Sequence, residues 1–139
     1  MHTDKIRVII VDDHEMVRAT WKMLLHEKQG IEVIAECASG AEAIELASTM
    51  QPDVMLIDVN MAPVNGFEAT RKIHKAHPQI RIIGVSINNQ ASYARNMMQL
   101  GAKAYVTKNS SREEMIFAIM EVMKGKTYIC KDMVGKMNE

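Results

Sequence analysis

The 139-residue sequence is poor in cysteine, lacks an excess of either charge and has no long apolar run. Its two cysteines, Cys37 and Cys130, lack CxxC or zinc-ligand spacing, which argues against a disulfide scaffold and makes a reducing cytoplasm the expected compartment. Basic and acidic residues both number 17, so no basic excess indicates a nucleic-acid-binding module. The apolar runs reach about six residues, far below the roughly 20 of a membrane span, so no membrane contact is expected.

Short β-prone apolar runs alternate with amphipathic segments of helical period. The predicted strands are Ile6–Val11, Ile31–Glu36, Asp53–Ile57, Ile80–Val85 and Lys103–Val106. The predicted helices are His14–Lys28, Ala41–Met50, Gly66–Ala76, Gln90–Leu100 and Ser111–Lys124. Strict alternation of strands and helices indicates a parallel sheet with helices on both faces. The sequence therefore predicts an α/β fold: a flavodoxin-like, doubly wound (βα)5 domain with a five-stranded parallel sheet of order 2-1-3-4-5.

The predicted domain ends near Gly125. Residues 1–124 contain every predicted strand and helix and have the size of one domain. From Gly125 the sequence becomes polar and loses clear periodicity, so residues 125–139 are predicted to form a C-terminal tail or the start of a linker. This segment is too short for a helix-turn-helix, so DNA would be bound only through an output domain absent from this chain.

Polar residues follow the predicted strands at their carboxyl ends, which is where open α/β sheets bind ligands. Asp12 and Asp13 follow the first strand, Asp58 the third and Ser86 the fourth, and Lys108 comes just beyond the fifth. In the predicted strand order these side chains converge. Carboxylates brought together repel one another unless a cation lies among them, and oxygen ligands suit Mg²⁺. The cluster therefore predicts a site for Mg²⁺ and a phosphoryl group, with a carboxylate as a possible nucleophile.

Each residue of the cluster also has an ordinary structural interpretation. Asp13 is a possible helix N-cap, Lys108 a possible solvated loop charge and Ser86 a possible turn residue. We favour the site because these interpretations would require independent coincidences at one edge of the sheet. His14 is interpreted as a residue that starts a helix without contacting the metal, since Mg²⁺ prefers oxygen ligands.

The same residues resemble the receiver domains of two-component response regulators. The resemblance extends from about Ile6 to Lys124. It rests on the acidic pair Asp12-Asp13, on Asp58 in LIDVNMAPVNGFEA, on Ser86 in IIGVS and on Lys108 in GAKAYVTK. The segments VDDH and GAKAYVTK are further similar to receivers that precede helix-turn-helix output domains of the NarL/FixJ (LuxR) type.

The resemblance implies which residues accept the phosphoryl group and bind the metal. Asp58 would be the phosphoacceptor, and the donor would be a phosphohistidine of a sensor histidine kinase. Asp13, Asp58 and the backbone carbonyl of Asn60 would bind Mg²⁺ directly. Asp12 would assist through a water molecule.

The resemblance also implies a switch and its partners. Lys108 would pair with the phosphoryl group, Ser86 would donate a hydrogen bond to it, and Tyr105 would follow Ser86 from an outward to an inward rotamer. The protein would be the receiver part of a transcriptional regulator and would catalyse only its own phosphorylation and dephosphorylation. A homodimer would form through surface helices, with Gln90–Leu100 and Ser111–Lys124 as candidates.

Three positions depart from the family pattern and keep two alternatives open. Ala62 stands where proline is usual, with Pro63 one residue later, Ile87 replaces a usually small residue, and Asn109 replaces a frequent proline. These departures are expected to affect rate and switching, and they leave a phosphate-independent pseudo-receiver that acts as a docking module as an alternative. A small-phosphoester hydrolase is a further alternative, but Asn60 stands where such an enzyme needs a second acid.

Overall fold

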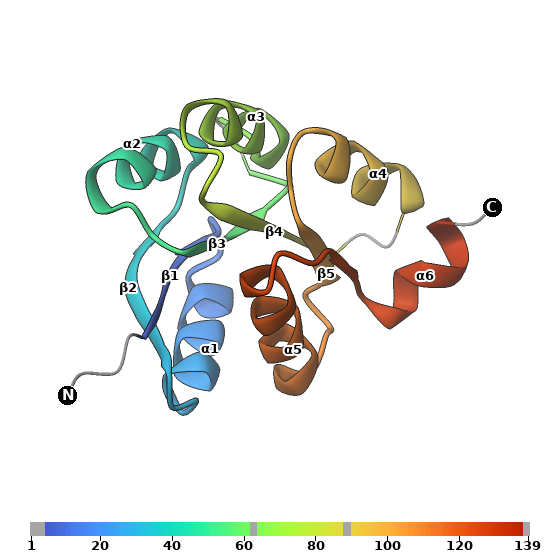
Figure 1. Cartoon of the computed structure of the whole chain (residues 1–139), viewed down its shortest axis with the longest axis horizontal. Coiled ribbons are helices and arrows are strands. Elements are labelled where there is room, and N and C mark those ends of the chain that lie inside the picture. Colours follow the sequence, from blue (N-terminus) through green and yellow to red (C-terminus); the bar gives the residue numbers. More distant parts are fainter. Residues whose placement is uncertain (1–4, 62–63, 88–89, 138–139) are drawn as a thin grey trace.

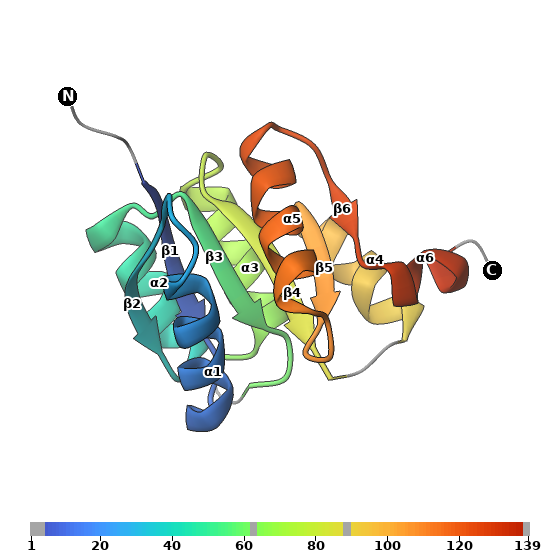
Figure 2. The same cartoon turned by 90° about the horizontal axis from the view of Figure 1, so that it is seen from below.

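The computed structural model describes residues 5–61, 64–87 and 90–137. In these residues a parallel sheet has the strand order β2-β1-β3-β4-β5-β6 (Figures 1 and 2). The strands are β1 (Ile6–Val11), β2 (Ile31–Cys37), β3 (Val54–Asp58), β4 (Arg81–Ser86), β5 (Ala104–Thr107) and β6 (Tyr128–Ile129). The helices are α1 (Glu15–His26), α2 (Gly40–Met50), α3 (Gly66–Ala76), α4 (Ala91–Gln99), α5 (Arg112–Met123) and α6 (Lys131–Met137).

Helices cover both faces of the sheet. Figure 1 shows α1 and α5 on one face and α2, α3 and α4 on the other, which confirms the predicted doubly wound α/β fold and the order 2-1-3-4-5 of its first five strands. The bounds of β1 and α3 agree with the sequence prediction, and the other predicted elements differ by one or two residues at an end. Within the described part of the chain, no helix combines the length and the apolar character needed to cross a membrane.

The sheet has a sixth strand where the sequence predicted five. β6 pairs with β5 in parallel and is followed by α6, and Cys130 and Met133 of this segment are buried. A two-residue strand is too short for its periodicity to be visible in the sequence, which explains why it was not predicted. The division into a receiver domain at 1–124 and a tail or linker at 125–139 stays a prediction.

The central strands are buried on both faces, which explains their nearly continuous apolar sequence. All residues of β3 and the last four of β1 are buried. Trp21 of α1 packs into this core. Asp58 is the last residue of β3, so its carboxyl group stands at the carboxyl edge of the sheet on a rigid, fully buried strand.

Candidate functional site

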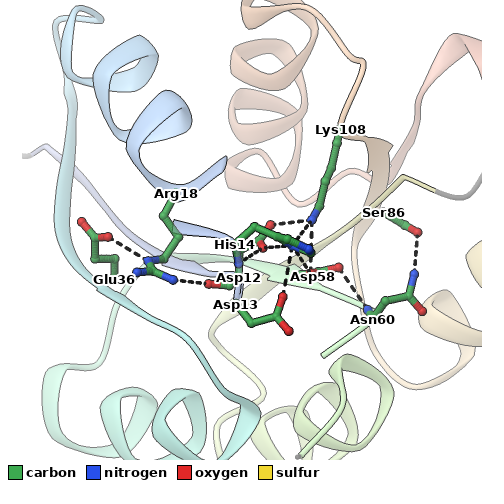
Figure 3. Close-up of polar contacts among 9 residues, drawn as sticks. All are labelled: Asp12, Asp13, His14, Arg18, Glu36, Asp58, Asn60, Ser86 and Lys108. Atoms are coloured by element: carbon green, nitrogen blue, oxygen red, sulfur yellow. Dashed lines mark hydrogen bonds and ion pairs between the residues drawn. The ribbon is translucent and has the colours of Figure 1, made fainter. Parts of the chain in front are cut away.

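The carboxyl ends of neighbouring strands bring the predicted polar residues together (Figure 3). Asp12 follows β1, Asp58 ends β3, Ser86 ends β4 and Lys108 lies just after β5. Because β1 pairs with β3, β3 with β4 and β4 with β5, these residues occupy adjacent positions along one edge. Asp12, Asp58 and Ser86 are buried, whereas Asp13 is exposed at the mouth of the site.

Lys108 joins the two buried carboxylates. Its Nζ lies 2.8 Å from Asp12 Oδ2 and 3.2 Å from Asp58 Oδ2, and its side chain is 8% exposed. Burial would lower the pKa of Lys108, but the carboxylates of Asp12 and Asp58 outweigh burial, and the pKa of the ammonium group is raised. One ammonium group against the carboxylates of Asp12, Asp13 and Asp58 leaves negative charge in excess, so the cluster attracts a cation.

The Asp58 carboxyl group is held in an energetically unfavourable charged state. Burial is the main cause that raises its pKa, to about 6, and the neighbouring Asp12 carboxylate raises it further. The backbone N–H of Asn60, which donates to Asp58 Oδ1 at 3.0 Å, and the Lys108 ammonium group oppose this shift. A cation bound beside Asp58 would offset the repulsion between the carboxylates of Asp12 and Asp58, and would thereby stabilise the ionised form of Asp58.

His14 lies among the carboxylates. Its Nδ1 is 3.0 Å from Asp12 Oδ1, 3.1 Å from Asp13 Oδ1 and 4.0 Å from Asp58 Oδ2. His14 is the N-cap of α1, so the interpretation of Asp13 as the N-cap is wrong, and the His14 side chain makes no capping hydrogen bond. Asp12, Asp13, His14 and Asp58 each offer one ligand atom, and these atoms all lie within 4.8 Å of one another. The donor set therefore fits a metal ion.

Asn60 connects the end of β3 to Ser86. Its Nδ2 donates to Ser86 Oγ at 3.3 Å, while its backbone N–H holds Asp58. Tyr105 is fully buried, and burial is the main cause that raises the pKa of its phenol, against a hydrogen bond with Ser86 that lowers it. Tyr105 thus occupies an inward position beside Ser86. The exchange between rotamers and the metal contact of the Asn60 carbonyl stay predictions.

Arg18 fixes the loop that carries the acidic pair. Its Nη1 donates to the Asp12 carbonyl oxygen at 2.7 Å, and its Nε donates to Glu36 Oε1 at 2.9 Å (Figure 3). Hydrogen bonds from Arg18 and Lys22 lower the pKa of Glu36, so the carboxylate that binds Arg18 stays charged. This contact was not predictable from the sequence, because it joins α1 to the end of β2.

The structure describes two of the three positions at which the sequence departs from the family pattern. Ile87, directly after Ser86, is 73% exposed, so its side chain is not packed over Asp58. Asn109, directly after Lys108, is exposed as well. Ala62 and Pro63 lie outside the described residues.

Gly66 allows the chain to pass close behind Asp58. A Cβ on Gly66 would overlap with the carbonyl oxygen of Asp58 and with Val59 Cα, and both are backbone atoms. We expect Gly66→Ala to lower the free energy of unfolding by about 1–3 kcal/mol, because the loop after β3 must shift. Urea denaturation measures this change. Gly135→Ala is the matched control, since a Cβ there meets no atom within 4 Å, and an equal loss in that variant would contradict the assignment.

Known proteins show similarity to this chain over most of its length. Residues 8–120 match the response regulator receiver domain family. Response regulator GacA of Pseudomonas viridiflava is 38% identical over 124 residues, which are 89% of this chain and 58% of GacA. Response regulator UvrY of Escherichia coli (strain K12) is 36% identical over 132 residues, which are 95% of this chain and 61% of UvrY. The chain thus spans about three fifths of the length of these curated relatives.

A solved structure agrees with this similarity. The crystal structure of a two-component response regulator of the LuxR family from Aurantimonas sp. SI85-9A1 superposes with a TM-score of 0.93 and 30% sequence identity, covering 97% of this chain and 96% of that one. The family match contains the acidic pair, Asp58, Ser86 and Lys108. The chain therefore belongs to the response regulator receiver domain family of two-component signalling.

Proposed function

We propose that the protein is a phosphorylation switch in which Asp58 accepts a phosphoryl group from a phosphohistidine of a sensor histidine kinase. The observation that carries this proposal is the buried Asp58 carboxylate, 3.2 Å from Lys108 Nζ and beside Asp12 and Asp13. A carboxylate oxygen of Asp58 would bond to phosphorus while the phosphorus–nitrogen bond breaks and its electron pair stays on the donor imidazole. The product is an acyl phosphate on Asp58.

Mg²⁺ is the proposed cation of the site. Asp13, Asp58 and the Asn60 carbonyl would hold it directly, and Asp12 would act through water. Oxygen donors and the excess of negative charge support this choice. When bound, Mg²⁺ supplies positive charge that neutralises the phosphoryl oxygens during transfer. The Lys108 ammonium group would orient the same oxygens, since its Nζ already contacts Asp58 Oδ2.

The proposed switch couples Asp58 to Ser86 and Tyr105. A phosphoryl group adds nearly two negative charges and three strong acceptor oxygens at Asp58. The Ser86 hydroxyl, which now accepts a hydrogen bond from Asn60 Nδ2, would instead donate to a phosphoryl oxygen. Tyr105 is buried beside Ser86, so a shift of Ser86 would change its packing. A change from 1% to 99% active molecules would require about 5.5 kcal/mol of differential stabilisation.

The direct test is phosphoryl incorporation from acetyl phosphate. In the presence of Mg²⁺ we expect one phosphoryl group per chain, and borohydride reduction followed by peptide mapping should place it on Asp58. With EDTA the incorporation should fall to background. Modification of a residue other than Asp58 would overturn the proposal. Absence of incorporation would favour a phosphate-independent docking module, and steady turnover of a chromogenic phosphoester would favour a hydrolase.

A transcriptional output is proposed for the protein to which this receiver belongs. GacA and UvrY extend beyond the matched region by about two fifths of their length, which is room for an output domain. DNA would be bound by that domain, and the receiver itself would catalyse only its own phosphorylation and dephosphorylation. A homodimer would form through α4 or α5, and the exposed apolar side chains of Phe117 and Met120 support α5.

A further inference from the structure

We infer that His14 supplies a nitrogen ligand to the cation of this site, so that Mn²⁺ and Co²⁺ are favoured over Mg²⁺ more strongly than in an all-oxygen site. The inference rests on the proposed function, because it concerns the cation that accompanies phosphoryl transfer. Its own evidence is the position of the His14 imidazole nitrogen among the carboxylates of Asp12, Asp13 and Asp58.

The distances between donor atoms fit an octahedral ion. With metal–ligand distances of about 2.1 Å, neighbouring ligand atoms lie about 3.0 Å apart and opposite ones about 4.2 Å apart. His14 Nδ1 lies 3.0 Å from Asp12 Oδ1 and 3.1 Å from Asp13 Oδ1, which are the separations of neighbouring ligands. Its 4.0 Å distance from Asp58 Oδ2 is close to that of an opposite ligand. The nitrogen and the oxygens of Asp13 and Asp58 therefore have separations that ligands of one ion can have, while Asp12 would act through water.

The orientation of the ring places Nδ1 where a ligand of the cation would lie. The His14 side chain is 60% exposed and makes no capping hydrogen bond, yet its Nδ1 is directed into the carboxylate cluster (Figure 3). The backbone N–H of His14 donates to Asp12 Oδ1 at 2.8 Å, which fixes the residue relative to that carboxylate. In the metal-free protein Nδ1 can donate to Asp12 Oδ1 at 3.0 Å when it carries the ring proton, or accept from Lys108 Nζ at 3.3 Å when the proton is on Nε2. Metal binding requires the second tautomer, in which the Nδ1 lone pair would bind the ion in place of the hydrogen bond to Asp12.

A nitrogen ligand changes which metal the site favours. Mg²⁺ is a hard cation that prefers oxygen, whereas imidazole suits transition metals, whose affinities rise from Mn²⁺ to Co²⁺ and beyond. His14 thus adds affinity for Mn²⁺ and Co²⁺ and little for Mg²⁺. The relevant quantity is the ratio of the dissociation constants for Mg²⁺ and Co²⁺, because this ratio cancels any general change in the charge of the cluster.

Pulsed electron paramagnetic resonance of the Mn²⁺-loaded protein observes the nitrogen directly. We expect nitrogen modulation from a coordinated imidazole in the wild-type spectrum and its loss in His14→Ala and His14→Asn. Asn restores an oxygen acceptor and is itself a favourable N-cap, so this variant keeps the start of α1 intact. His26→Ala is the matched control: His26 is exposed at the other end of α1 and should leave the modulation unchanged.

Calorimetric titrations of the same variants with Mg²⁺ and Co²⁺ complete the test. We expect His14→Asn to reduce the preference for Co²⁺ over Mg²⁺ on the order of tenfold, and His26→Ala to leave it unchanged. Absence of nitrogen modulation in the wild type, or an equal rise in affinity for both metals in His14→Asn, would overturn the inference; the latter would show that the ring only occupies the metal position. Acetyl phosphate labelling of wild-type protein with Mg²⁺ tests the proposed function separately.

Discussion

Asp58→Asn is expected to abolish phosphoryl incorporation and to raise the stability of the metal-free protein. The amide cannot form the acyl phosphate, so incorporation from acetyl phosphate should fall on the order of a hundredfold or more. The substitution is nearly isosteric, and its amide oxygen can still accept the hydrogen bond from the Asn60 backbone N–H. It removes one of the buried charges that repel one another in the absence of a cation.

The sign of the stability change follows from the pKa of Asp58. Its value in the folded protein is raised from 3.8 to about 6, so folding favours the protonated carboxyl group. The stability that Asp58 contributes is fully present below about pH 4 and is lost as the pH rises through 6. At pH 7.5 the ionised side chain therefore costs on the order of 2–3 kcal/mol, and removal of its charge should recover much of this.

Urea denaturation in EDTA at pH 7.5 and pH 5 measures the change. We expect Asp58→Asn to be more stable than the wild type at pH 7.5 and the difference to narrow at pH 5. Mg²⁺ should reduce the difference at pH 7.5, because it stabilises the wild-type carboxylates by binding the folded state. Asp132→Asn, a change at an exposed carboxylate, is the control. If Asp58→Asn were less stable than the wild type at pH 7.5, the contacts with Lys108 and the Asn60 N–H would already compensate the buried charge of Asp58 in full.

The strand pattern explains why most of the site was predictable. Strands buried on both faces give nearly continuous apolar runs, so the first polar residue after each run marks the carboxyl edge of the sheet. Asp12 and Asp58 are found there, in adjacent strands as the predicted order requires. Ser86 follows the same rule, and Lys108 comes one residue after Thr107, the first polar residue beyond the fifth run. The position of a strand end is thus encoded locally, and parallel pairing brings the ends together.

The parts that were not predictable depend on contacts between segments far apart in the sequence. Arg18 supports the Asp12 loop through Glu36 at the end of β2, and no spacing in the sequence encodes that contact. His14 is adjacent to the acidic pair, but the direction of its ring depends on side-chain rotamers. β6 is a two-residue strand that exists because β5 offers a free edge beside it. Such features require the assembled fold.

Lys108→Met is expected to have the opposite effect on stability from Asp58→Asn. Methionine keeps the length and much of the apolar bulk of lysine but leaves Asp12 and Asp58 without their shared ammonium group. Removal of one partner from a buried ion pair costs about 3–5 kcal/mol when the other charges stay behind. We therefore expect a loss of this order in urea denaturation at pH 7.5 in EDTA. Lys103→Met, at an exposed lysine before the same strand, should change little.

A double-mutant cycle separates charge compensation from packing. Lys108 lowers the pKa of Asp58, so its removal raises that pKa above about 6. The loss in Lys108→Met should therefore shrink as the pH falls toward 6, because Asp58 of the variant takes up a proton at a higher pH than Asp58 of the wild type. For the same reason, Asp58→Asn should rescue part of the loss in the double variant, with a coupling free energy of about 1–3 kcal/mol. Additive effects at pH 7.5 would mean that Lys108 does not compensate the charge of Asp58. A loss that Mg²⁺ partly reverses would show that the lysine and the metal neutralise the same carboxylates.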